Sequence, residues 1–267
     1  MLILLPPSEA KARASEGDPY DLTYAPKPLR PVIRRVRHAL ISLCRKDPQA
    51  ASRALKLGTR GADLVALNAG LRSEPCAPAA TVYTGVLFDH LQIATMTPSA
   101  RAWADAHVAV CSALFGFVGL RDLIPAYRLS AGTPLPGQPA LSKLWQPALQ
   151  SHITSLPADH SALILDLRSG PYAALWRPSG ALAPRMVVGK VWHEGADGRV
   201  RATSHANKAV KGRLVRDLAH AGVVAADPDG LCAALNDLGW PAQQRDGQLN
   251  IVWTGPSVGD SDEADPG

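Results

Sequence analysis

Apolar residues recur along the chain at two spacings, and these spacings predict its secondary structure. Helical spacing, with an apolar residue at every third or fourth position, predicts helices over residues 29–46, 49–57, 62–72, 86–91, 99–107, 141–155, 206–221 and 228–238. Short apolar runs and turn signals predict strands over residues 1–5, 81–83 and 162–167 and hairpins over residues 184–205 and 240–254. Residues 108–114 fit a buried strand or a buried helix, and periodicity does not decide between the two.

The predicted strands and helices alternate from one end to the other, without a linker, an internal repeat or a break in composition. Such alternation is typical of α/β proteins, in which helices cover a sheet. We therefore predict one α/β domain over residues 1–254, with a mixed sheet and surrounding helices. Residues 255–267 are rich in Pro, Gly, Ser and acidic residues, and we expect a disordered acidic tail there.

The charge distribution adds an expectation about partners. The chain has 28 Lys and Arg against 23 Asp and Glu, which gives a net charge of +5. Acidic residues gather in the expected tail, so the body is more basic than the total indicates; they are Asp260, Asp262, Glu263 and Asp265. A basic body favours an anionic partner such as nucleic acid.

Several features that the sequence lacks narrow the function further. No apolar run approaches the roughly 20 residues of a membrane span, and the first residues do not resemble a signal peptide, so we expect a soluble, cytoplasmic protein. The 4 cysteines and 8 histidines are scattered, so we expect free thiols, no metal site and no cofactor. The glycine-rich dinucleotide and P-loop motifs and the G-x-S-x-G of α/β-hydrolases are absent.

Three loops that follow predicted strands carry reactive side chains. Ser8 and Lys11 follow the first strand, Tyr83 ends the second, and a third loop contains Arg168, Ser169 and Tyr172. Ligands of open α/β sheets bind at the carboxyl ends of strands. If the first strand and the 162–167 strand are parallel neighbours, these loops converge on one cleft. Lys11 and Arg168 would form an anion site there, with the hydroxyl groups as hydrogen-bond partners.

Three further segments carry positive charge. Between Asp122 and Arg128 the composition indicates either a buried Asp–Arg pair or an arginine that faces an anionic ligand. Lys208 and Lys211 lie three residues apart in the first turns of a predicted helix, with Arg213 close by, and this arrangement favours phosphate binding. The arginine-rich face of residues 30–37 is either solvated or in contact with phosphates.

Several segments together resemble the YaaA peroxide-stress protein family, in the same order along the chain. They are Met1-Leu-Ile-Leu-Leu-Pro-Pro-Ser-Glu-Ala-Lys11, Val82-Tyr-Thr-Gly85, Ser112-Ala-Leu-Phe-Gly116, Leu120-Arg-Asp-Leu-Ile-Pro-Ala-Tyr-Arg-Leu129, Leu144-Trp145 and Lys208-x-x-Lys211-Gly212. The similarity extends to about residue 254. It implies a single α/β domain of unusual topology, described as a cantaloupe fold.

The resemblance also implies a function. Members of the family are cytoplasmic proteins that limit oxidative damage, lower free iron during peroxide stress and bind DNA. The family has been compared with helix-hairpin-helix DNA-binding proteins, and the matching stretch here is residues 58–70. This stretch contains Arg60, and it has Ala66 where a hairpin glycine is expected.

Two hypotheses about function remain open at this point. The first is a stress protein that binds DNA without strong sequence specificity through Lys208, Lys211, Arg213, Arg34, Arg37 and Arg60. The second is an enzyme acting on an anionic small molecule, a nucleotide or a damaged base, with Lys11 as nucleophile or base. In this second hypothesis, the further candidates for catalysis are Ser8 and Tyr172. The candidates for binding the anion are Tyr83, Arg128, Arg168, Ser169 and Lys208. An enzyme that acts on a flipped base within DNA would combine the two.

Overall fold

A computed structural model describes residues 1–58, 61–157, 163–194, 200–201 and 204–254. Its main sheet contains eight strands: seven follow the order β4-β3-β1-β6-β7-β10-β9, and the eighth, β8, pairs with β7. The strands are β1 (Leu2–Leu5), β3 (Val108–Ser112), β4 (Gly116–Gly119), β6 (Ile164–Asp166), β7 (Met186–Glu194), β8 (Val200–Arg201), β9 (Ala242–Arg245) and β10 (Gln248–Trp253). A second sheet pairs β2 (Cys76–Pro78) with β5 (Leu123–Pro125).

The centre of the main sheet is parallel and its edges are antiparallel. β1 pairs in parallel with β3 on one side and with β6 on the other, and β6, β7 and β10 continue the parallel order. β4, β8 and β9 pair antiparallel with their neighbours. The chain therefore first runs from β1 to β3 and β4, and then returns to β6 on the other side of β1. The strand order reverses between β1 and β6, which is where open α/β sheets bind ligands.

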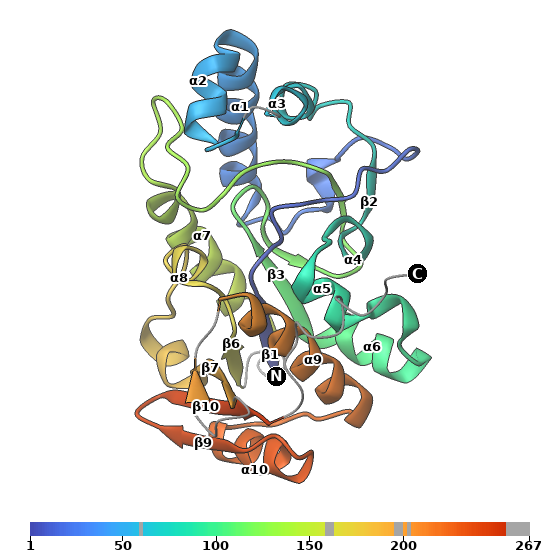
Figure 1. Cartoon of the computed structure of the whole chain (residues 1–267). Coiled ribbons are helices and arrows are strands. Elements are labelled where there is room, and N and C mark those ends of the chain that lie inside the picture. The colour runs from blue at the N-terminus through green and yellow to red at the C-terminus, as the bar shows by residue number, and fades with distance from the viewer. Residues whose placement is uncertain (59–60, 158–162, 195–199, 202–203, 255–267) are drawn as a thin grey trace, which may run out of the picture.

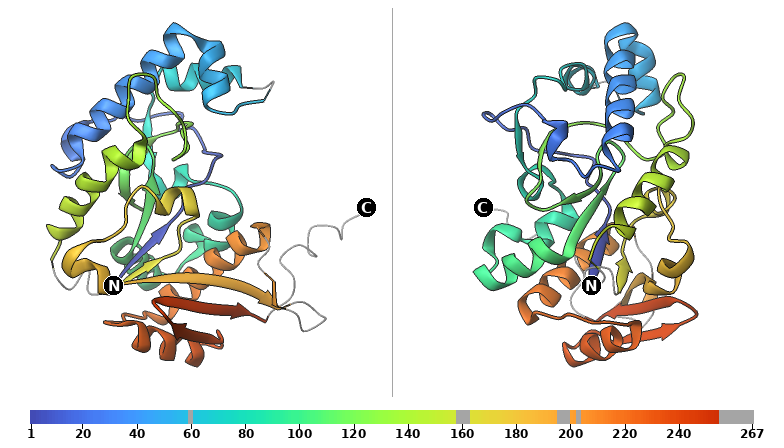
Figure 2. Two further views of the ribbon diagram at one scale, coloured as in Figure 1. Left: turned by 90° about the vertical axis from the view of Figure 1, so that its left-hand side faces the viewer. Right: turned by 180° about the vertical axis from the view of Figure 1, so that it is seen from behind.

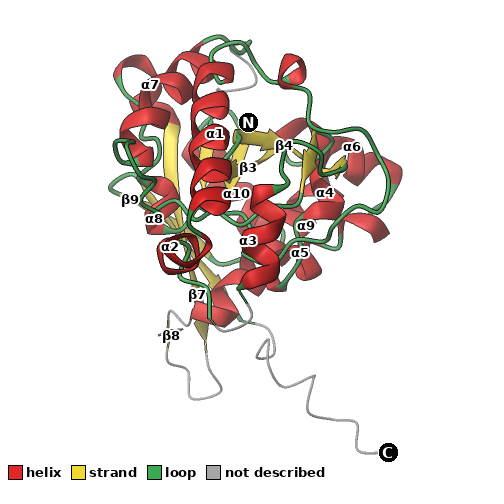
Figure 3. Ribbon diagram, turned by 90° about the horizontal axis from the view of Figure 1, so that it is seen from above, coloured by secondary structure: helices red, strands yellow, loops and turns green. Residues whose placement is uncertain are grey.

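Helices lie on both sides of this sheet (Figures 1 and 2). They are α1 (Arg30–Lys46), α2 (Pro48–Ala54), α3 (Ala62–Ala69), α4 (Ala79–Val82), α5 (Val86–Leu91), α6 (Pro98–His107), α7 (Leu141–Thr154), α8 (Gly170–Ala173), α9 (Ser204–Ala221) and α10 (Pro228–Asp237). Three short 3-10 helices in the described residues are η1 (Leu22–Tyr24), η2 (Ile93–Thr95) and η3 (Gly180–Arg185). Helices α5, α6 and α9 lie on one side and α7 on the other, whereas α1, α2 and α3 pack together beyond the sheet (Figures 1 and 3).

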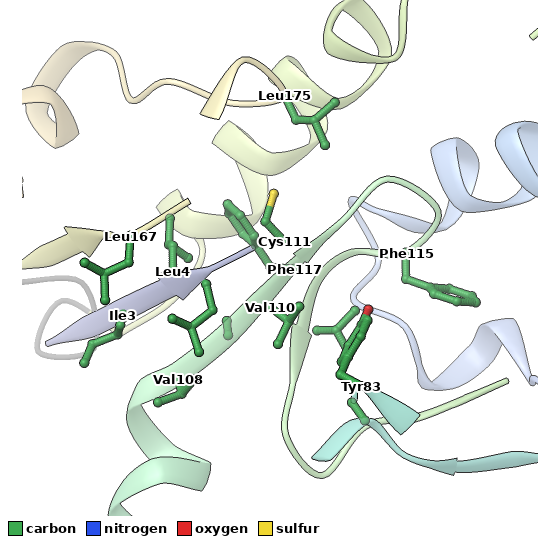
Figure 4. Packing of buried hydrophobic residues seen from close by; sticks show 14 of the residues in the cluster. Ile3, Leu4, Tyr83, Val108, Val110, Cys111, Phe115, Phe117, Leu167 and Leu175 are labelled. Atoms are coloured by element: carbon green, nitrogen blue, oxygen red, sulfur yellow. The ribbon is translucent and has the colours of Figure 1, made fainter. Parts of the chain in front are cut away.

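The core forms around the central strands. Ile3, Leu4 and Leu5 of β1 are completely buried, as are the apolar residues of β6. Figure 4 shows Ile3 and Leu4 among residues of β3 and the segment that follows β6. Burial on both faces explains why β1 is continuously apolar in sequence and β6 is apolar except for Asp166. It also places the loops that follow β1 and β6 at a rigid edge.

Most of the predicted elements are confirmed, including the alternation of strands and helices in one α/β domain. The hairpin at residues 240–254 closes on Asp246 and Gly247, whose positive φ angles of 51° and 72° suit a tight turn. Residues 108–114, left open by periodicity, contain strand β3. The turn of the 184–205 hairpin and the expected acidic tail lie outside the described residues.

The prediction of a strand at residues 81–83 is wrong. The backbone there forms the short helix α4, and the Tyr83 N–H donates to the carbonyl of Ala79. Tyr83 then makes one isolated antiparallel bridge with Lys11. Local i→i−4 hydrogen bonding therefore prevails over the strand preference of the Thr-Val-Tyr sequence.

Candidate binding pocket

A pocket of about 560 Å3 opens at the carboxyl ends of β1 and β6. Its walls are residues 6–10 after β1, residues 84–88 at the start of α5, Ser169 and Tyr172 after β6, and Asn207, Lys208 and Lys211 on α9. Its volume lies in the range of roughly 300–1,000 Å3 that is usual for small-ligand sites. The expected convergence of the loops after β1 and β6 is therefore observed.

The loop after β1 is shaped by its own sequence. Pro6 and Pro7 cannot donate to a sheet ladder and end the strand. Ser8 Oγ then donates to the carbonyl of Ala10 at 2.6 Å and accepts the backbone N–H of Thr84 at 3.2 Å. One side chain thus ties the loop after β1 to the loop before α5. This contact stabilises two walls of the pocket.

Gly212 determines how closely α5 and α9 approach each other. A Cβ atom at this position would lie 2.1 Å from the carbonyl oxygen of Leu87 and 2.9 Å from the backbone nitrogen of Leu91. Both distances are far too short for a methyl group, so only glycine permits this backbone contact. The close approach brings Lys208 and Lys211 to the same pocket as Leu87 and Phe88.

The two lysines of α9 differ in their surroundings. Lys208 is exposed on the pocket wall. Lys211 is half-buried, and its Nζ donates to the carbonyl of Leu167 at 2.8 Å. Burial lowers the pKa of Lys211, while the nearby Asp166 carboxylate acts in the opposite direction. An ammonium group has three N–H donors, so this bond leaves Lys211 donors for an anion.

Lys11 lies behind the pocket rather than on its wall. Its Nζ donates to the carbonyl of Ser8 at 2.6 Å and lies 4.2 Å from the ring centroid of Tyr127 and 5.4 Å from that of Tyr83. Burial lowers the pKa of Lys11 to about 7, and the positive charge of Arg128 acts in the same direction. The sequence predicted a lysine with a shifted pKa here, but its amine contacts the back of the loop.

The rings around Lys11 form a buried hydroxyl network. Tyr83 and Tyr127 share a hydrogen bond of 3.1 Å between their hydroxyls, and Ser112 Oγ lies 2.7 Å from the Tyr127 hydroxyl. Burial raises the pKa of both tyrosines. Tyr83 is therefore a neutral core residue beneath the loop, and it does not line the pocket.

The two candidate arginines, Arg128 and Arg168, are held by carboxylates. Arg128 forms an ion pair of 2.8 Å with Glu9. This ion pair explains the position of the Arg128 side chain without a pair to Asp122 or an anionic ligand. Arg168 is completely buried in its side chain and forms two bonds of 2.8 Å to Asp166. Its guanidinium also donates to the carbonyl of Trp176 at 2.9 Å. Arg168 therefore supports the loop after β6 from inside.

The candidates for DNA contact lie on two separate helices. Lys208, Lys211 and Arg213 are on α9, and the Arg213 guanidinium lies 4.6 Å from the ring centroid of Trp253. Arg34 is exposed on α1, whereas Arg37 is half-buried and stacks over Tyr20 with a separation of 5.7 Å. Helix α1 lies in the other half of the molecule from α9 (Figure 1). Arg60 lies outside the described residues.

The structure thus brings Ser8, Ser169, Tyr172, Lys208 and Lys211 together and leaves the remaining candidates elsewhere. Sequence reasoning named Gly212 as part of the family motif but missed its role in the packing of α9 against α5. Sequence reasoning also missed Asp166. The available signal was the presence of a carboxylate inside an otherwise apolar strand.

The described residues contain no cluster of three or more His, Cys, Asp or Glu side chains that could hold a metal ion. In the same part of the chain, no helix is long and apolar enough to cross a membrane. The pocket is lined by lysines, hydroxyl groups and apolar side chains. Fold and site together describe an α/β protein with a cationic pocket at the switch point of its sheet.

Residues 1–244 match the model of the peroxide stress protein YaaA family, and the chain belongs to this family. A UPF0246 protein of Streptomyces coelicolor is 39% identical over 246 residues, which cover 91% of this chain and 92% of the relative. A UPF0246 protein of Corynebacterium efficiens is 40% identical over 222 residues, which cover 82% and 85%. A relative from Corynebacterium glutamicum is 34% identical over 224 residues, with the same coverage.

Proposed function

We propose that this member of the peroxide stress family binds DNA without strong sequence specificity and thereby limits iron-mediated oxidative damage. The observation that carries the proposal is the pair Lys208 and Lys211 on one face of α9, at the edge of an open pocket. The positive charges of two lysines three residues apart on a helix repel each other, and an anion between them offsets this repulsion. A phosphate group of DNA supplies such an anion.

This form of binding accounts for the lack of sequence specificity. Lysines that contact phosphates fix the position of a protein on DNA but do not read the bases. The positive charge of the chain outside its acidic C-terminal segment contributes at longer range.

The proposal also explains, without iron ligands, how the protein would protect DNA from iron-mediated damage. DNA carries a condensed layer of counterions, and a protein that neutralises phosphates releases them. Ferrous ions are among the cations that such a layer holds. Displacing them moves the site of peroxide chemistry away from the nucleic acid.

Fluorescence anisotropy with labelled duplex DNA across a salt series tests the proposal. We expect an affinity that falls steeply with salt and is nearly equal for unrelated sequences. Lys208→Glu should weaken binding, whereas Lys143→Glu, which makes the same charge change at an exposed position on α7, should have a much smaller effect. Absence of binding at about 50 mM salt, or equal effects of both substitutions, would overturn the proposal.

A second candidate function is an enzyme that acts on an anionic small molecule, and the surroundings of Lys11 favour it. A lysine whose pKa is about 7 is partly unprotonated at neutral pH and can act as nucleophile or base. Reductive methylation at pH 7.5 followed by peptide mapping tests whether the amine is reactive. Faster modification of Lys11 than of the exposed Lys143 would support an enzyme; an unmodified Lys11 would count against it.

A further inference from the structure

The lining of the pocket combines two kinds of surface. Pro6, Pro7, Leu87 and Phe88 contribute apolar surface, and the Phe88 ring stacks on that of Tyr83 with ring centroids 5.3 Å apart. Ser169, Asn207 and the two lysines of α9 contribute polar and positively charged surface. A ligand that fits both kinds of surface has a flat apolar part and an anionic part. This division is more than phosphate contact requires, because phosphates of a DNA backbone bind to a flat cationic surface.

Charge in the pocket favours an anion at its α9 side. Lys208 and Lys211 both line this side, and Lys211 is anchored to the carbonyl of Leu167. Among the described residues that line the pocket, Glu9 is the only one with a carboxylate, and this carboxylate forms an ion pair of 2.8 Å with Arg128. The negative charge of Glu9 is therefore compensated, and the lysines dominate the local field.

The walls are held in place before any ligand arrives. The Ser8–Thr84 hydrogen bond joins two loops, and Lys11 holds the first of them from behind through the carbonyl of Ser8. Gly212 keeps α9 in backbone contact with α5. A preformed cavity loses little conformational entropy on binding, which is typical of a specific ligand site.

We propose that the pocket binds a single unpaired nucleotide, with its base against the apolar surface of Pro6, Pro7 and Leu87 and its phosphate between Lys208 and Lys211. A base-paired duplex is much larger than this cavity, so a nucleotide enters only when it has left its stack. Damaged, mismatched or bubble DNA offers such nucleotides at the lowest cost. This inference rests on the proposed DNA binding, and it identifies an unpaired nucleotide as the part of DNA that enters the pocket.

Ser169→Trp provides a test that changes the volume of the pocket without changing its charge. Ser169 is exposed, lines the pocket, and precedes α8 without a side-chain capping bond. Its φ of −79° and ψ of 158° suit any residue. Ser179→Trp is the matched control, because Ser179 is also exposed and extended before a short helix but does not line the pocket.

The experiment uses the full chain and DNA that carries 2-aminopurine, a base whose fluorescence reports unstacking. One duplex places the probe in a bubble, and a second is fully paired. We expect wild-type protein and Ser179→Trp to bind the bubble about tenfold more tightly than the paired duplex and to change the fluorescence of the probe. Ser169→Trp should lose both the preference and the fluorescence change.

Binding of free dAMP, measured by calorimetry, separates the two sources of the nucleotide. If dAMP binds the wild-type protein but not Ser169→Trp, while neither DNA binds, the pocket takes a free nucleotide and the proposed DNA function fails. If both DNAs bind equally, with no fluorescence change and no effect of Ser169→Trp, and dAMP does not bind, DNA binding stands and the nucleotide pocket is overturned. Binding of neither DNA nor dAMP overturns both proposals.

Discussion

Two cations close to the pocket show how differently a buried charge can be accommodated. Arg168 is surrounded by carboxylate and carbonyl oxygens, with two 2.8 Å bonds to Asp166. The Lys11 amine is surrounded by one carbonyl oxygen and two tyrosine rings. The charges of Glu9 and Arg128 act on its pKa in opposite directions. Arg168 therefore stays charged, while Lys11 is close to losing its proton at neutral pH.

Replacing Lys11 by Met should change how stability depends on pH. Below pH 7 the folded and unfolded states both protonate Lys11, so the cost of burying its charge is present in full. Between pH 7 and 10.5 the unfolded state binds more protons, so this cost falls by up to about 1.4 kcal/mol per pH unit. Urea unfolding at pH 7 and pH 9 should show wild-type stability rising relative to Lys11→Met. A difference that does not change with pH would contradict the assigned pKa.

Removing the carboxylate that pairs with Arg168 should be strongly destabilising. In Asp166→Asn the guanidinium remains buried without its counter-charge, and we expect a loss of about 3–5 kcal/mol in urea unfolding. The control is Asp105→Asn, which breaks the partly exposed i,i+4 pair with Arg101 and should cost only about 0.3–0.5 kcal/mol. If Asp166→Asn does not fold, Asp166→Leu combined with Arg168→Met should restore folding. Equal losses in the two single variants would disprove the role of burial.

At the scale of elements, the pocket depends on the packing of α9 against α5. Helix α9 carries the lysines, and α5 carries the apolar wall residues Leu87 and Phe88. Gly212 lies directly after Lys211, at the point where the two backbones meet. The segment from Lys208 to Gly212 therefore supplies both the positive charges and the close helix contact that places these charges at the pocket.

Gly212→Ala should push the two helices apart. Alanine favours helix formation over glycine by about 1 kcal/mol, yet its Cβ would overlap the Leu87 carbonyl. We expect a net loss of roughly 1–3 kcal/mol in unfolding free energy and weaker DNA binding. Gly230→Ala in α10 is the control, where the nearest atom to a Cβ is the Asp227 side chain at 3.3 Å. That variant should be neutral or more stable, and a Gly212→Ala protein of wild-type stability would refute the packing argument.

At the scale of the whole molecule, the sheet topology decides where a ligand can bind. The order β3-β1-β6 places the first strand of the chain at the centre and reverses the connection beside it. The loops after β1 and β6 both line the pocket there, together with residues of α5 and α9. The acidic C-terminal segment lies outside the described residues, and its negative charge partly offsets the positive charge of the rest of the chain.

Deleting residues 255–267 should strengthen DNA binding, since it removes Asp260, Asp262, Glu263 and Asp265 and no basic residue. We expect an affinity gain of roughly tenfold at low ionic strength that disappears at high salt, where long-range charge is screened. Replacing the four acidic residues by Asn and Gln in the full-length chain should reproduce the gain. If the deletion leaves affinity unchanged at low salt, the charge of this segment does not affect binding.

The class of fold, most helix positions and the basic character of the chain can be derived from the amino-acid sequence. These properties depend on local signals, such as the apolar spacing of α1 or the Asp246–Gly247 turn, which act within a few residues. Which cations face the pocket depends on the folded chain. Lys11 points to Tyr127, Arg168 turns inward to Asp166, and Gly212 meets Leu87, because side-chain direction and burial depend on neighbours brought close only by folding.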